Sequence, residues 1–272
     1  MGISTADVDR NGWPDLFVTN FHDETNTLYL NSGSHGFEDR TEPFGLSGRG
    51  RHLMGWGCQF LDADGDGWQE LMIVNGLLHD GPQPPQIYSF REQGTIDLTE
   101  QAGEYFQQSW QGRGVAKIDF DRDQRIDLVV THQVEPAALL RNATVDLSPP
   151  DRTGSDLTGA NHSAADRGLR RVTLRLIGRY GPRDATGAIV HWRPSASASD
   201  SRSPQVESRQ FISRQGGYLT SSTSDLLLTL PEGGESSLQI RWPGGKQQTV
   251  VLPAERTTWT VFEGADRALP VR

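Results

Sequence analysis

Acidic side chains in this sequence are concentrated in three short stretches. They are DVDRNGWPD (residues 7–15), DADGDGWQE (62–70) and DFDRDQRID (119–127), which align as D-x-D-x-(D/N)-(G/Q)-x-x-(D/E). Oxygen-bearing side chains at alternate positions of a tight loop converge on one point, and a hard divalent cation prefers roughly six to eight oxygen ligands. The pattern therefore predicts loops that bind calcium.

The candidate calcium ligands occupy five positions of each loop. Positions 1, 3, 5 and 9 offer side-chain oxygens, and position 7 offers a backbone carbonyl. Glycine at position 6, Gly12 and Gly67, permits a sharp turn, whereas Gln124 must adopt that turn at a conformational cost. The predicted ligands are Asp7, Asp9, Asn11, Trp13 and Asp15; Asp62, Asp64, Asp66, Trp68 and Glu70; and Asp119, Asp121, Asp123, Arg125 and Asp127.

The charge of the chain is set by these loops. They contain 11 of the 35 acidic residues, and the other 24 nearly balance the 26 lysines and arginines, so that the net charge is −9. Neighbouring carboxylates at ~4 Å repel by about 1 kcal/mol even in water, and bound divalent ions would relieve this repulsion. A net negative charge also argues against a nucleic-acid partner, which usually requires a basic face.

The acidic loops could also belong to an EF-hand, or they could be solvated turns without an ion. An EF-hand begins with the same pattern, but it needs a glutamate at position 12 and a helix on each side. Position 12 here is Val18, Ile73 or Val130, each inside a strand-like apolar run. Solvated turns remain an alternative, because Asp and Asn favour turns whether or not an ion is bound.

The acidic loops are part of a longer repeat. Their first acids are 55 and 57 residues apart, and a glycine stands five residues before each, at Gly2, Gly57 and Gly114. Each unit is expected to run strand, acidic loop, strand, turn, strand, strand, because its apolar runs are too short for helices. A repeat of this length is typical of a β-propeller blade. We therefore expect about two and a half blades over residues 1–142.

The remainder of the chain predicts a second all-β domain. Residues 143–169 are polar and rich in turn formers, so they are expected to form a linker or irregular loop. From 170 to 264, short alternating apolar runs such as VTLRLIG, LLLTL, LQIRW and TWTVF predict an antiparallel, sandwich-like domain, followed by a tail at 265–272. The fold class expected for the whole chain is all-β, a partial β-propeller followed by this domain.

Several other classes of protein find no support in the sequence. The single cysteine, Cys58, rules out an internal disulfide. No apolar run approaches the ~18 residues of a membrane span, so no membrane insertion is expected. The first residues, MGISTADVDRNG, do not have the features of an export signal. No G-x-S-x-G nucleophile motif occurs, and the clustered carboxylates are already assigned to the loops, so the protein is not expected to be an enzyme.

The repeats resemble the FG-GAP, or VCBS-type, repeats of integrin-α-like propellers. DVDRNGWPDLFVTN, LDADGDGWQELMIVNG and LYLNSGSHGFEDRT carry this resemblance. Residues GRYGPRDATGAIV (178–190), GGYLTSS (216–222) and LQIRWPGGKQQTV (238–250) resemble the ASPIC/UnbV domain that follows such repeats in the cartilage acidic protein family. Leu228–Pro231 stands where that family usually has a Gly-Leu-Gly stretch. The resemblance implies a propeller with calcium in its blade loops, and a binding or adhesion role outside the cytoplasm or in the cell envelope, without catalysis.

The resemblance leaves the partner open. A protein or a carbohydrate ligand is expected, with a purely structural module as another possibility. A polysaccharide hydrolase or lyase is the alternative of a different class, because propellers also host such active sites. Propellers usually close with about seven blades, so we expect either a truncated C-terminal piece of a longer protein or a misplaced start that also removed an export signal, and whether further blades lie upstream of Met1 stays open.

Overall fold

The computed structural model describes residues 1–79, 81–144, 169–192, 208–214 and 217–271, so most of the predicted linker at 143–169 lies outside the described residues. Strands dominate the described residues, together with two short 3₁₀ helices, η1 (Gly33–His35) and η2 (Glu104–Gln107). The predicted all-β class is therefore confirmed. The chain divides into two compact units. The first comprises Met1–Ala63, Trp68–Asn142 and Arg214–Thr223, and the second comprises Asp64–Gly67, Ala143–Ser213 and Ser224–Arg272.

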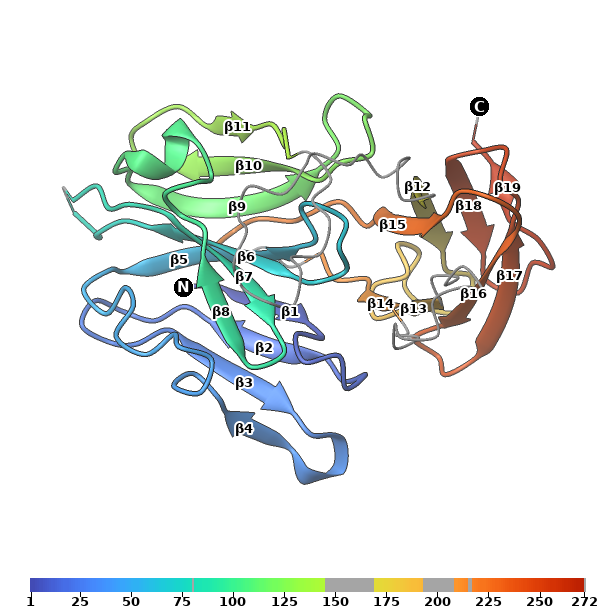
Figure 1. Cartoon of the computed structure of the whole chain (residues 1–272), viewed down its shortest axis with the longest axis horizontal. Helices are drawn as coiled ribbons and strands as arrows, with labels where there is room; N and C mark the ends of the chain where they lie inside the picture. The colour runs from blue at the N-terminus through green and yellow to red at the C-terminus, as the bar shows by residue number, and fades with distance from the viewer. Residues whose placement is uncertain (80, 145–168, 193–207, 215–216, 272) are drawn as a thin grey trace, which may run out of the picture. The chain divides into compact units, whose positions relative to one another are not determined.

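Three antiparallel sheets form the first unit within the described residues (Figure 1). In each, the strands pair in chain order as a meander, which is the predicted order within a blade. The strands are β1 (Ile3–Ala6), β2 (Asp15–Val18), β3 (Thr27–Asn31) and β4 (Phe37–Asp39); β5 (Gly55–Leu61), β6 (Glu70–Asn75), β7 (Gln86–Arg91) and β8 (Gly94–Asp97); and β9 (Gly112–Ile118), β10 (Asp127–His132) and β11 (Ala138–Leu140).

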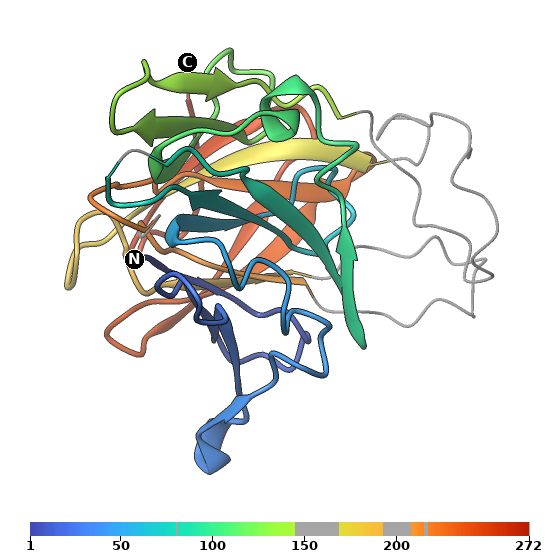
Figure 2. The ribbon, with the colours of Figure 1, turned by 90° about the vertical axis from the view of Figure 1, so that its left-hand side faces the viewer.

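The three sheets lie side by side in chain order, from blue through cyan to green in both ribbon views (Figures 1 and 2). Their first strands are neighbours, because β5 contacts both β1 and β9. This is the arrangement of propeller blades, whose innermost strands face the central axis. The predicted partial propeller is confirmed.

The middle sheet is covered on both faces, which explains why the sequence of β6 does not alternate between apolar and polar residues. All residues of β6 are buried, whereas β2 alternates buried and partly exposed residues. Phe60 and Phe90 pack in a core with the first sheet, while Met72 and Val74 pack in a second core with the third sheet. A strand covered on both faces reads as a continuous apolar run, as in LMIV at 71–74.

Two four-stranded sheets pack over one apolar core in the second unit. Alternate residues of β15 and β16 point into this core, as their alternating burial shows, so the predicted sandwich-like domain is confirmed. The expectation of purely antiparallel pairing was wrong, because β12 and β18 pair in parallel. β19 lies within the predicted tail and pairs with β18. The sheets are β15 (Leu226–Pro231), β12 (Leu169–Ile177), β18 (Thr258–Phe262) and β19 (Leu269–Pro270); and β14 (Ser208–Phe211), β13 (Ile189–Trp192), β16 (Ser236–Arg241) and β17 (Gln247–Leu252).

A segment between β14 and β15 belongs to the first unit although the chain on both sides of it belongs to the second. Within the described residues 217–223, Gly217 bridges to Gly114, and the Thr220 hydroxyl donates to the carbonyl of Val115 at 3.1 Å. The buried Ser222 hydroxyl donates to Gln59 Oε1 at 2.9 Å. We call residues 217–223 the inserted segment. It lies against the innermost strands β5 and β9.

Close backbone contacts explain the glycines that precede the acidic loops. A Cβ placed on Gly2 would lie 2.7 Å from the Cα of Gly217, and one placed on Gly57 would lie 2.8 Å from the backbone nitrogen of Val115. Neighbouring innermost strands and the inserted segment therefore approach more closely than any side chain at these positions would allow.

Candidate metal sites in the blade loops

The carboxylate at position 9 anchors the first loop to the strands behind it. Asp15 begins β2 and is fully buried. One of its oxygens accepts from the backbone N–H of Val8 at 2.8 Å, and the other accepts from the N–H of Asn31 at 2.8 Å. A single side chain thus joins the start of the loop to the end of β3. Buried charge is tolerated only with such partners.

The third loop repeats this anchor. Asp127 is also buried, and it accepts from the N–H of Phe120 at 2.9 Å and from the N–H of Asn142 at 2.7 Å. In the second loop Glu70 accepts from the N–H of Ala63 and from the hydroxyl of Ser89, at 2.8 and 2.7 Å. The shared register found in the sequence is therefore also a shared three-dimensional construction.

The turn itself is formed by short side-chain bonds to backbone N–H groups. In the first loop Asp7 accepts from Gly12 at 2.9 Å and Asn11 accepts from Trp13 at 2.8 Å. In the third loop Asp119 accepts from Gln124 at 3.2 Å and Asp123 accepts from Arg125 at 2.9 Å. The bonds to Asn11 and Asp123 span two residues and are those of Asx turns, whereas the bonds to the first aspartate span five residues and close the loop.

The loops also share an unusual backbone. Positions 4 and 6 have positive φ in all three, and glycine occupies only some of them. Gln124 adopts φ 67° in the place of Gly12, which has φ 94°, so the third loop keeps the turn at the conformational cost predicted from the sequence. The remaining values are 61° for Arg10, 77° for Gly65, 82° for Gly67 and 61° for Arg122.

Each loop brings three carboxylates together. One oxygen from each member of a group lies within 4.8 Å of the others. Asp123 and Glu70 lie outside these groups. The remaining predicted ligands are not carboxylates and are therefore not members of the groups; they are the Asn11 side chain and the carbonyls of Trp13, Trp68 and Arg125. The groups are Asp7, Asp9 and Asp15; Asp62, Asp64 and Asp66; and Asp119, Asp121 and Asp127.

The electrostatics of the loops fit a cation. Asp119 Oδ1 is buried and has no hydrogen-bond partner, which is costly for a charged oxygen unless a positive group approaches it. Burial, followed by the charges of the neighbouring aspartates, raises the pKa of Asp119. Burial raises the pKa of Asp15 to about 7, although two backbone N–H groups oppose the change. A calcium ion would satisfy the oxygen and favour the charged form of both carboxyls.

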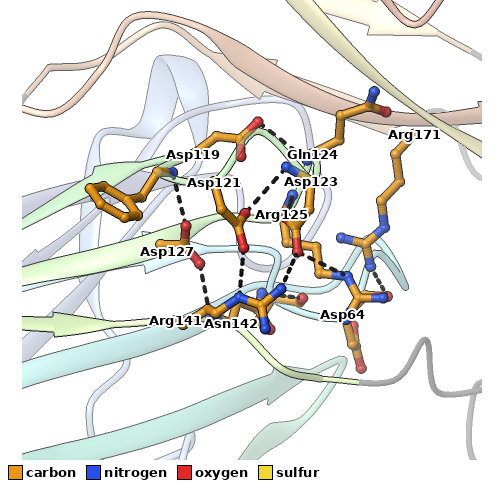
Figure 3. A network of polar contacts seen from close by, with 12 residues as sticks. Asp64, Asp119, Asp121, Asp123, Gln124, Arg125, Asp127, Arg141, Asn142 and Arg171 are labelled. Carbon is orange, nitrogen blue, oxygen red and sulfur yellow. Dashed lines mark hydrogen bonds and ion pairs between the residues drawn. The ribbon is translucent and has the colours of Figure 1, made fainter.

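An arginine beside the third loop was not predicted. Arg141 follows β11, and its Nε lies 2.6 Å from Asp121 Oδ2 while its Nη2 lies 3.6 Å from Asp123 Oδ2 (Figure 3). Arg125 Nε lies 4.0 Å from Asp123 as well. Arg141 is 14 residues beyond the end of the loop, so only the pairing of β10 with β11 indicates that it returns to the loop.

A contact between neighbouring loops was also missed. The guanidinium of Arg10, at position 4 of the first loop, lies 3.6 Å from the ring centre of Trp68, at position 7 of the second. This distance is well within the range of a cation–π interaction. The tryptophan at position 7 therefore contributes its ring to blade-to-blade packing, in addition to the carbonyl predicted to face the ion.

Comparison with known families agrees with this geometry. The FG-GAP-like repeat family matches residues 7–73 and 62–130, and each match begins at the first aspartate of a loop. The ASPIC and UnbV family matches residues 178–268. The chain contains FG-GAP-like repeats followed by an ASPIC and UnbV domain. The resemblance inferred from the sequence is thereby confirmed, and the ASPIC and UnbV match includes the inserted segment as well as strands β13 to β18.

Curated relatives of this FG-GAP-like repeat protein match it across most of its length at low identity. Cartilage acidic protein 1 of Homo sapiens is 25% identical over 256 residues, which are 90% of this chain and 33% of the relative. The Xenopus tropicalis protein of the same name is 23% identical, with 90% and 34% covered, and that of Mus musculus is 24% identical, with 93% and 35% covered. The chain thus spans about a third of the length of these relatives. Among the described residues, no helix has the length and apolar character that crossing a bilayer requires.

Proposed function

We propose that the FG-GAP-like repeats bind calcium as a structural ion and that the protein is a binding or adhesion module without catalytic activity. The observation that carries this proposal is the common construction of the loops. Three loops in one register each place three carboxylate oxygens within 4.8 Å. A divalent ion offsets the repulsion of such a group and ties the loop to its strands.

The proposed ligands are those predicted from the sequence. In the first loop Asp7, Asp9, Asn11 and the carbonyl of Trp13 surround the ion, with Asp15 joining the ion to the strands. The second and third loops follow the same positions, with the differences described above. The ion supplies positive charge and fixed geometry, while the hydrogen bonds of the position-9 carboxylate hold the loop in place in its absence.

The location and partner follow from the same proposal. Calcium modules outside the cell bind with a Kd of ~10⁻⁴–10⁻³ M, which suits an extracellular or cell-envelope protein. The partner proposed is a protein or carbohydrate, and the net charge of −9 does not favour nucleic acid.

Calcium titration of the full chain tests the metal proposal. After treatment with EDTA, isothermal titration with CaCl₂ should give at least two saturable sites, and a tenfold excess over Kd should stabilise the fold by about 1.4 kcal/mol per site. The double variant Asp62→Ala, Asp64→Ala should lose one site. The matched control Glu92→Ala, Glu100→Ala removes two exposed acids outside the loops and should keep every site. The proposal is contradicted if the titration shows no heat of calcium binding and calcium does not change the unfolding temperature.

Incubation with polysaccharides separates a binding module from the hydrolase or lyase alternative. A glycosidase would need a pair of carboxylates about 5–9 Å apart that is free of the blade loops. The binding module should retain a glycan or protein partner without changing it. Release of new reducing ends or unsaturated sugars by the purified protein would instead establish catalysis.

A further inference from the structure

We propose that Arg141 is a built-in counter-ion of the third blade loop, which makes this loop a weaker calcium site than the first. The proposal rests on the calcium binding proposed above. It assigns the difference between the loops to a residue that lies outside the loop sequence. The third loop would then hold its shape through an ion pair, where the first depends on a metal ion.

The contact is specific in its geometry. Arg141 Nε lies 2.6 Å from Asp121 Oδ2, a short distance typical of a charge-assisted hydrogen bond, and Nη2 lies 3.6 Å from Asp123 (Figure 3). Asp121 and Asp123 occupy positions 3 and 5, which are two of the side-chain positions that calcium is predicted to use. One guanidinium therefore lies against two of the four carboxylates that are predicted to bind the ion in this loop.

The equivalent position in the other blades carries no charge. Asn31 and Asn142 are equivalent, because the backbone N–H of each donates to the position-9 carboxylate of its own loop. The residue before Asn31 is Leu30, which is buried in the core between the first two sheets. In the second blade the residue paired with Glu70 is Ser89. Of these three positions, only that of Arg141 carries a positive charge. The second loop has a different arginine nearby, because Arg171 Nη2 donates to the carbonyl of Asp64 at 3.2 Å, so the contrast in charge is between the third loop and the first.

In the first loop the position-3 carboxylate, Asp9, has hydrogen-bond donors other than an arginine. Asp9 accepts from the backbone N–H of Asn11 at 3.1 Å and from the Asn11 amide at 3.0 Å, both neutral donors within the loop. Neutral donors leave the negative charge of Asp9 in place for a metal ion. The guanidinium at Asp121 offsets that charge, so calcium gains less by binding there.

The ion pair weakens calcium binding without abolishing it. The Arg141 side chain is 66% exposed and that of Asp121 is 30% exposed, so water competes with their attraction. Asp119 Oδ1 remains buried with no hydrogen-bond partner on the inner side of the loop. Calcium therefore still has an acceptor in the third loop, but it must displace the guanidinium to use positions 3 and 5.

Calcium titration of the full-length Arg141→Gln variant tests this inference. The variant should tighten calcium binding at the third loop by about threefold to fivefold, because an exposed ion pair has a modest effect. Adding Asp119→Asn to this variant should remove the tightened site, which places it in the third loop. Arg141→Lys, which keeps the charge but lacks the planar fork, should stay nearer the wild type. Arg49→Gln is the matched control, since Arg49 forms an exposed ion pair with Asp97 away from the loops.

A second measurement guards against a loss of folding. In EDTA the Arg141→Gln variant should unfold at a lower temperature than the wild type, and calcium should restore most of the difference. A variant that stays less stable at saturating calcium, or one in which no calcium site is tightened by the substitution, would overturn the role of Arg141. If instead neither the wild type nor any variant binds calcium at the first two loops, the proposed function itself fails.

Discussion

Gly57 and Gly217 approach each other so closely that neither has room for a side chain on the facing side. A Cβ placed on Gly217 would lie 2.5 Å from the Cα of Gly57, and Gly217 also has φ 93°, in the left-handed region. The two residues are 160 positions apart in sequence. Their contact fixes the inserted segment against the innermost strands of the blades.

Replacement of Gly217 by alanine should therefore destabilise the first unit by about 1–3 kcal/mol, because strain and overlap act together. Urea unfolding followed by tryptophan fluorescence measures the loss. Gly233→Ala is the control, since a Cβ there meets nothing within 4 Å and should change stability little. Equal stability of the two variants would show that the close approach is not a constraint.

Ser222 is the polar anchor of the inserted segment. Its buried hydroxyl donates to Gln59 Oε1 at 2.9 Å and accepts from the backbone N–H of Lys117 at 3.1 Å. Ser222→Ala should cost about 1–3 kcal/mol, because both partners lose a bond in a buried setting. Ser237→Ala, at an exposed position of β16, should be nearly neutral in the same unfolding assay.

Arg10 should stabilise the neighbouring blade through Trp68. Arg10→Ala removes the cation–π contact and should cost about 0.5–1 kcal/mol, with a change in tryptophan emission. Arg122→Ala is the matched control, because Arg122 holds the same loop position with the same φ of 61°. Within the described residues no ring contact is found for Arg122, so its replacement should leave the emission unchanged. A similar loss from both variants would point to loop strain as the cause.

The buried carboxyl of Asp15 should make stability depend on pH when calcium is absent. An unfolded aspartate ionises near pH ~3.9, whereas burial raises the pKa of Asp15 to about 7 in the folded protein. The folded state therefore binds the Asp15 proton more tightly than the unfolded state. The resulting contribution to the free energy of unfolding is fully present at low pH and is lost as the pH rises through about 7.

The comparison with Asp15→Asn isolates this effect. In EDTA, the stability of the wild type relative to the variant should fall between about pH 4 and about pH 7 and level off above that. Saturating calcium should remove the decline, because the ion favours the charged carboxyl. If the difference in unfolding free energy between the wild type and the variant does not change with pH in EDTA, the raised pKa of Asp15 is contradicted.

The sequence alone determined the acidic loops, their register and the short strands around them. Asp7, Asp62 and Asp119 begin segments in which ligand type, turn residues and apolar runs all lie within about a dozen positions, and such local patterns are read directly from spacing. The apolar alternation of LLLTL and LQIRW likewise predicts strands of a sheet with one buried face, because side chains alternate between the two faces of a strand.

The tertiary structure decided which distant residues contact these loops and strands. Arg141 reaches Asp121 only because β11 pairs with β10, and Gly217 meets Gly57 only because a segment of the second half of the chain lies on the innermost strands. The glycine before each acidic loop was visible as a repeat, but its reason was a backbone contributed from far along the chain. Sequence patterns record the preferences of a residue and its neighbours, whereas these contacts depend on which distant strands the fold brings together.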